Sequence, residues 1–194
     1  MTEAPTRPSA RQVQLLDAAY EYVLEHGLTD LSLRPLAAAI GSSPRVLMFL
    51  FGNKDGLVRA LLARARVEEL ALIEQLDRDR PTASSGLAEA TELVWSWLRA
   101  SGHRRLLRLW VEAYARSVVE PDGAWAGFAS TTVDDWLGVL ARCQPEAERD
   151  SAEGAARRTL ALAVLRGCLL DLVASGDEAR VDAAMADHLS RAGT

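Results

Sequence analysis

Apolar residues recur at three- and four-residue spacing along almost the whole chain, which is the spacing of one face of an α-helix. No segment shows the two-residue alternation of a β-strand, and no two apolar runs are joined by a hairpin turn. The sequence therefore predicts an all-α fold of about nine helices. The expected helices cover residues 12–26, 33–40, 44–49, 54–78, 85–100, 103–119, 124–143, 153–174 and 178–191.

The composition excludes several classes of protein. Hydrophobic residues make up 49% of the 194 residues and charged residues 25%, which is typical of a globular rather than a disordered chain. No apolar run approaches the roughly 18 residues needed to span a bilayer, and the N-terminus lacks the layout of a signal peptide. Two cysteines are too few for a disulfide scaffold. We therefore expect a cytoplasmic protein with no membrane partner.

The charges are unevenly distributed along the chain. The net charge is −5, from 22 basic and 27 acidic residues. Residues 1–60 carry six of each sign, so their sum is zero and residues 61–194 hold the whole negative excess. The only lysine, Lys54, lies in the neutral part. A neutral N-terminal part joined to an acidic body is compatible with a small DNA-binding head.

Two short expected helices, separated by Gly41 and Ser42, fit a helix-turn-helix. Ser32 and Ser43 stand where N-caps are expected, and Pro44 occupies the favoured first position of the second helix. In such a motif the second helix projects its first side chains into the major groove. Two ordinary helices of a bundle are the alternative interpretation.

The stretch from Gly27 to Leu57 closely resembles the DNA-binding domain of the TetR family of transcriptional regulators. The resemblance covers about residues 11–60, and its ending is an aromatic residue, a lysine and a leucine at the family's spacing, here Phe51, Lys54 and Leu57. The sequence departs from the family at Met48, where a tyrosine usually stands; methionine cannot donate a hydrogen bond to a phosphate.

The resemblance implies a three-helix helix-turn-helix head over residues 1–53, linked through helix 54–78. Residues 54–194 would then form a ligand-binding and dimerisation domain. A ligand in that domain would move helix 54–78, so that two heads lose their register on DNA.

Roles for individual residues of the head follow from their chemistry. Lys54, at the start of a helix, can place its positive charge next to a phosphate. The Arg45 guanidinium has the geometry to donate two hydrogen bonds to guanine. Val46 can meet a thymine methyl group. The alternative is that the cations are ordinary solvated side chains. The expected DNA-binding residues are Ser32, Arg34, Ser43, Pro44, Arg45, Val46, Phe49 and Lys54.

Two heads held one DNA turn apart would bind a palindrome far better than one, so we expect a homodimer. The most apolar expected helix, 153–174, is the candidate interface, together with 124–143. Alternatively, both helices are internal core. The expected interface residues are Leu160, Val164, Leu165, Cys168, Leu169 and Leu172.

All five tryptophans lie in the body, and aromatic side chains dominate apolar ligand pockets. An aromatic stripe is also what an ordinary core contains. We assign Trp136 to core or interface. The expected ligand-binding residues are Thr91, Trp95, Trp110, Tyr114, Trp125, Phe128 and Thr132.

No motif for catalysis, a cofactor or a metal is recognisable. The three histidines stand far apart, and the chain has no phosphate-binding loop or nucleophile elbow. We interpret Cys143 and Cys168 as small buried hydrophobes, with a redox switch as the alternative.

The sequence thus predicts a non-enzymatic, ligand-responsive repressor, released from a palindromic operator by a small apolar or aromatic molecule. The alternatives are an all-α small-molecule-binding protein and an interaction module that has lost DNA binding.

Overall fold

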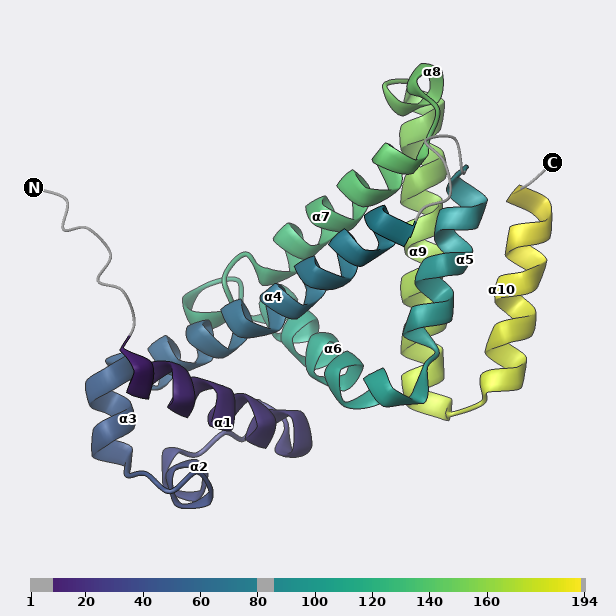
Figure 1. The fold of residues 1–194 in the computed structure, drawn as a ribbon. Helices are drawn as coiled ribbons and strands as arrows, with labels where there is room; N and C mark the ends of the chain where they lie inside the picture. The colour runs from purple at the N-terminus through teal and green to yellow at the C-terminus, as the bar shows by residue number, and fades with distance from the viewer. Residues whose placement is uncertain (1–8, 80–85, 193–194) are drawn as a thin grey trace, which may run out of the picture.

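The computed structural model describes residues 9–79 and 86–192, and these contain helices, turns and loops but no strand (Figure 1). The all-α prediction is therefore confirmed. The helices are α1 (Ala10–His26), α2 (Leu33–Ala39), α3 (Pro44–Phe51), α4 (Lys54–Asp79), α5 (Leu87–Leu98), α6 (Arg104–Val119), α7 (Phe128–Cys143), α8 (Glu146–Arg149), α9 (Ala152–Ser175) and α10 (Glu178–Ala192).

Two details of the predicted helices are wrong. The expected helix 124–143 begins only at Phe128, because Gly127 has a φ of 74° and a separate 3₁₀ turn, Gly123–Trp125, precedes it. The one-turn helix α8 was not expected, because four residues after Pro145 are too few to show a helical period. No described helix combines the length and the apolar character needed to cross a membrane.

The head consists of α1, α2 and α3 packed on the first turns of α4 (Figure 1). Its centre is filled by fully buried side chains, among them Tyr20, Leu36 and Leu47. The Ser43 hydroxyl caps α3 by accepting a hydrogen bond from the Val46 amide (3.3 Å), as predicted. Ser32 stands at the expected N-cap of α2, but its hydroxyl makes no capping hydrogen bond.

The long helix α4 leaves the head beside α3 and continues into the body, where α7 lies alongside it (Figure 1). The remaining helices build the body around α9, which contacts α5, α6, α7 and α10. Helix α6 lies between the body and the head, since it packs on α1 as well as on α7 and α9. Both α4 and α6 therefore connect the two parts.

Candidate DNA-binding surface and internal cavity

The surface of the head beside α3 carries cations without partners. Ser32, Arg34, Pro44 and Lys54 line one open recess between the start of α2 and the starts of α3 and α4. Within the part of the chain that the structure describes, no ion pair or hydrogen bond involves the side chains of Arg34, Arg45 or Lys54. Most arginines of the body, by contrast, bind a carboxylate. The head therefore leaves positive charge free for an external anion.

The expected DNA-binding residues lie together on this surface. Arg45, Val46 and Phe49 are exposed on α3, on the side away from the buried Leu47. Ser43 immediately precedes them, and its hydroxyl is already used in capping α3. The arrangement agrees with a recognition helix, and the individual contacts to DNA stay predictions.

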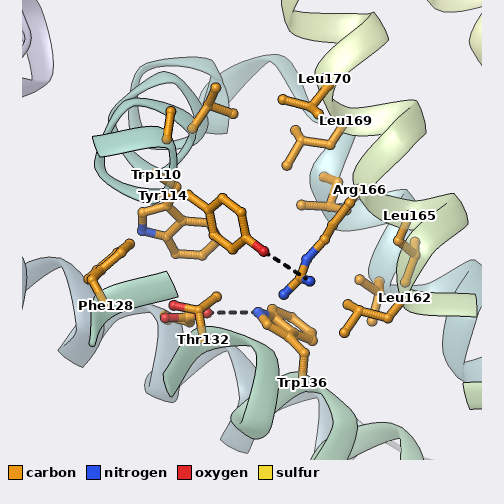
Figure 2. A pocket seen from close by; sticks show the side chains of 15 residues that line it. Trp110, Tyr114, Phe128, Thr132, Trp136, Leu162, Leu165, Arg166, Leu169 and Leu170 are labelled. Atoms are coloured by element: carbon orange, nitrogen blue, oxygen red, sulfur yellow. Dashed lines mark hydrogen bonds between the residues drawn. The ribbon is translucent and has the colours of Figure 1, made fainter. Parts of the chain in front are cut away.

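The body encloses a cavity of about 230 Å³ between α4, α5, α6, α7 and α9 (Figure 2). Four of the expected ligand-binding residues line it: Trp110, Tyr114, Phe128 and Thr132. The rest of the lining is mostly aliphatic. Its other members are Glu69, Val94, Leu98, Val111, Ala115, Trp136, Leu162, Leu165, Arg166, Leu169 and Leu170.

Three expected ligand-binding residues do not line this cavity. Thr91 is buried, and its hydroxyl donates to the Leu87 carbonyl within its own helix (2.7 Å). The Trp95 indole faces α10, where its Nε1 donates to Asp182 Oδ1 (2.8 Å). Trp125 lies half-buried in the 3₁₀ turn before α7. For Trp95, helical phase indicated burial, but the side chain packs toward another helix and not toward the cavity.

A carboxylate lies at the wall of the cavity. Glu69, on α4, is only 1% exposed, and its Oε1 accepts a hydrogen bond from Trp136 Nε1 (2.7 Å). Its Oε2 accepts no hydrogen bond from a described residue, and Arg66 Nη1 lies 4.0 Å away. Burial raises the pKa of Glu69 to about 7, although the Trp136 hydrogen bond and the charges of Arg66 and Arg166 act in the opposite direction.

A guanidinium faces the same cavity from α9. The Arg166 guanidinium lies over the Tyr114 ring, 5.1 Å from its centroid, and Nη1 is 3.5 Å from the Tyr114 hydroxyl. Figure 2 shows these two side chains pointing toward one another, with Thr132 and Trp136 extending from α7. Arg166 therefore brings a second charged group to a largely apolar site.

Four polar atoms of the lining are buried and have no hydrogen-bond partner among the described residues: Glu69 Oε2, Trp110 Nε1, Thr132 Oγ1 and Arg166 Nη2. A buried polar atom left without a partner costs about 1–3 kcal/mol, so native proteins hold few of them. Their gathering around one cavity makes it the candidate ligand site of the body, with a mostly apolar wall and a few polar groups.

The expected dimer residues on α9 divide into two groups. Leu160 is 58% exposed, and Val164 and Cys168 are half-buried on the same side of the helix. Leu165 and Leu172, by contrast, are buried within the subunit, and both Leu165 and Leu169 line the cavity. Leu165 and Leu172 thus pack within the subunit, and the dimer interface stays a prediction.

A direct link between α6 and the head was not expected from the sequence. The Glu112 carboxylate accepts hydrogen bonds from the Leu28 amide (2.9 Å to Oε2) and from the Thr29 hydroxyl, just after α1. Gly27 allows this approach, because a Cβ there would lie 3.1 Å from Glu112 Oε2 and its φ is 79°. One turn of α6 thus holds the head through Glu112 and lines the cavity through Val111 and Tyr114.

The family model described as bacterial regulatory proteins, tetR family, matches residues 15–61, which run from within α1 to the third turn of α4. This part of the chain is therefore similar to the N-terminal region of the tetR family. The match covers the helix-turn-helix of the head and does not extend into the body.

Solved structures of TetR-like fold match nearly the whole chain. A transcriptional regulator of Rhodococcus sp. Rha1 is 20% identical, with a TM-score of 0.74, covering 93% of this chain and 94% of that one. The multidrug binding protein EbrR complexed with proflavin is 22% identical (TM-score 0.66; 94% and 99% covered). The fatty acid degradation regulator FadR of Bacillus halodurans is 13% identical (TM-score 0.65; 96% of each chain). These likenesses show the fold, and no curated protein matches the chain.

Three residues of the body escaped the sequence prediction: Glu69, Glu112 and Arg166. Glu69 and Glu112 stand in helices rich in charged residues, so composition and spacing do not distinguish them from solvated ones. Only Arg166 carried a signal, as one of two charges in an otherwise apolar run. Trp136, assigned to core or interface, lines the cavity as well.

Proposed function

We propose that this chain is a repressor of the TetR type that binds a palindromic operator as a homodimer and is released by a small apolar or aromatic molecule. In this proposal residues 1–53 form the DNA-binding domain, and residues 54–194 bind the effector and form the dimer. No enzymatic step is part of it. The observation that carries the proposal is that α4 and α6 both line the cavity and both hold the head.

The free cations of the head support the operator contact. Lys54 lies at the start of α4, where backbone amides and the helix dipole already favour an anion. Arg34 borders the same recess, and Arg45 lies in the first turn of α3. Phosphate contacts of this kind give affinity, and a bidentate arginine gives base specificity.

The cavity supports an effector of mixed character. Its aromatic and aliphatic walls suit an apolar body, and Trp110, Thr132 and Arg166 can each donate a hydrogen bond to it. Glu69 Oε2 can accept one. We therefore expect an effector with an apolar ring system or chain and with both a donor and an acceptor.

The exposed side of α9 supports the dimer. Leu160, Val164 and Cys168 form an apolar stripe at four-residue spacing, which is the spacing of a helix that packs on another helix. Leu160→Arg should give a monomer in sedimentation velocity, whereas Val13→Arg, an exposed apolar position on α1, should leave a dimer.

Selection of bound duplex DNA from a random pool tests the operator contact. We expect a palindromic sequence, with an affinity that falls steeply as salt is raised because phosphate binding releases counterions. Lys54→Ala should weaken binding to all sequences and reduce the salt slope by about one per subunit. Arg45→Ala should relax the preference at one base pair. A chain that selects no sequence and binds DNA at no salt concentration would instead be an all-α small-molecule-binding protein.

The effector is tested by adding the compounds of a metabolite panel to the complex with the selected operator and measuring release of the DNA. Val111→Phe should fill the cavity and abolish release while operator binding is kept. Val118→Phe is the matched control, because it is the same change at an exposed position on the same helix, outside the cavity. If Val111→Phe were released like the wild type, the effector would bind elsewhere.

A further inference from the structure

The exposed face of α3 is apolar apart from one cation. Phe49 is 86% exposed, Met48 49% and Val46 38%. Arg45 and Phe49 are four residues apart and therefore lie one turn from each other, on the side opposite the buried Leu47. Val46 and Met48 flank them. Three large apolar side chains thus gather on a helix of eight residues.

These side chains cannot bind phosphates by hydrogen bonds. Neither phenylalanine nor valine has a polar side-chain atom, and the methionine sulfur is only a weak acceptor. No described residue of the chain covers Phe49, which is almost fully in contact with solvent. If α3 enters the major groove, most of the surface that it presents to the bases is hydrocarbon.

The surroundings of this face identify its partner as DNA. Arg45 lies within the face, and Arg34 and Lys54 border the recess beside the start of α3, all without carboxylate partners among the described residues. This charge complements two phosphate strands on either side of a groove. The inference therefore rests on the proposed DNA binding and asks which bases the apolar face reads.

The major groove displays one apolar group on its unmodified base pairs, the C5-methyl of thymine. Apart from the small C5–H of cytosine, the other features that distinguish the base pairs there are hydrogen-bond donors or acceptors. An apolar side chain gains by covering a methyl group and loses by covering a donor or acceptor that water would otherwise bind.

We propose that Val46, Met48 and Phe49 contact thymine methyl groups in the major groove. Each half-site of the operator should then contain thymine next to the base pair that Arg45 contacts. Phe49 contributes most, because it has the largest exposed apolar surface and lies in the middle of the face. Met48, at the flank of the face, contacts a methyl group as well, because its side chain offers an apolar contact and no hydrogen bond to a phosphate.

Replacing single thymines of the selected operator by deoxyuridine tests this inference. The exchange removes the methyl group and leaves every hydrogen-bonding atom of the base pair in place. We expect about a three- to fivefold loss of affinity at one or more thymines of each half-site, which corresponds to the burial of one methyl group. A T·A to C·G change at that position should weaken binding further, and 5-methylcytosine should recover part of the loss.

Variants of the three side chains assign each methyl group to its reader. Phe49→Ala should bind the operator equally well with thymine or uracil at the position that Phe49 covers. Met48→Ala and Val46→Ala should likewise lose the preference for thymine at the positions that these two side chains cover. These exposed positions are not part of the core, and circular dichroism checks that the helices are kept. Lys54→Ala is the matched control: it should weaken binding to both operators by the same factor and leave their ratio unchanged.

Three outcomes would overturn the inference while the proposed regulator stands. The selected operator could lack thymine under α3, uracil could replace every thymine without loss, or the uracil penalty could persist in all three alanine variants. A wild-type chain that binds no DNA would instead remove the proposed function and this inference together.

Discussion

The head and the body differ in where their candidate binding groups lie. In the head, the centre is apolar around Leu36 and Leu47, and the cations without partners lie on the outer surface. In the body, four buried polar atoms without a hydrogen-bond partner among the described residues, such as Glu69 Oε2, lie around the cavity. In the proposed function, this difference means that the head recognises DNA with its surface and the body recognises an effector through its cavity.

The largest effect is expected from the same substitution made in each region. Leu47→Ala, in the filled centre of the head, should reduce the free energy of unfolding by about 2–5 kcal/mol. Leu162→Ala should reduce the free energy of unfolding by less, because Leu162 already borders the cavity and its truncation removes fewer contacts. Urea unfolding of both variants measures the difference. Equal losses would mean that the body is filled as tightly as the head.

The buried carboxylate should make the stability of the body depend on pH. The pKa of Glu69 rises from its ordinary 4.5 to about 7 on folding, so the folded state binds the proton more tightly. The stabilisation is fully present below pH 4.5 and is lost as the pH rises to about 7, by an amount on the order of 3 kcal/mol. The groups that face Glu69 are Trp136, Arg66, Asp135 and Arg166.

Unfolding free energies of wild type and Glu69→Gln, measured by urea denaturation from pH 4.5 to 8, check this expectation. The amide does not ionise, so the decrease between pH 4.5 and 7 should be smaller in the variant. Glu153→Gln, at an exposed position on α9, is the control and should follow the wild type. Identical curves for wild type and Glu69→Gln would show that the carboxylate is solvated, and the contrast with the head would weaken.

The same contrast explains what the sequence could predict. The signals of the head are local: Gly27 and Gly41 end helices with positive φ, and the Ser43 hydroxyl caps α3, so neighbouring residues specify the turns. The cavity depends on which buried faces meet. Helical phase correctly predicted that Trp95 and Trp110 are buried. The packing of helices distant in the sequence decides that Trp95 faces Asp182 and that Trp110 faces the cavity. Periodicity carries no information about that choice.

An intermediate effect is expected where the two regions meet. Glu112→Ala removes the hydrogen bonds from the Leu28 amide and the Thr29 hydroxyl, so a change at the cavity should reach the head less effectively. We expect the effector to shift operator affinity several-fold less than in wild type, a loss of about 1 kcal/mol of coupling. Operator titrations with and without effector measure it.

Glu120→Ala is the matched control for this variant. Glu120 directly follows the same helix and pairs only with Arg116, one turn before it. It should respond to effector like the wild type. If the two variants lost the response equally, disturbance of α6 in general, and not the contact with the head, would carry the coupling.

The smallest effect is expected from the second contact between α6 and α1. Arg105 and Glu25 form an ion pair at 3.2 Å, but both side chains are exposed. Exposed pairs contribute about 0–1 kcal/mol and are screened by salt. Arg105→Ala should therefore change unfolding and the effector response little, and not at all at high salt. If it reduced the response as much as Glu112→Ala, general attraction between charged helices would join the regions. The specific contact of one carboxylate with the backbone after α1 would then not be what carries the signal.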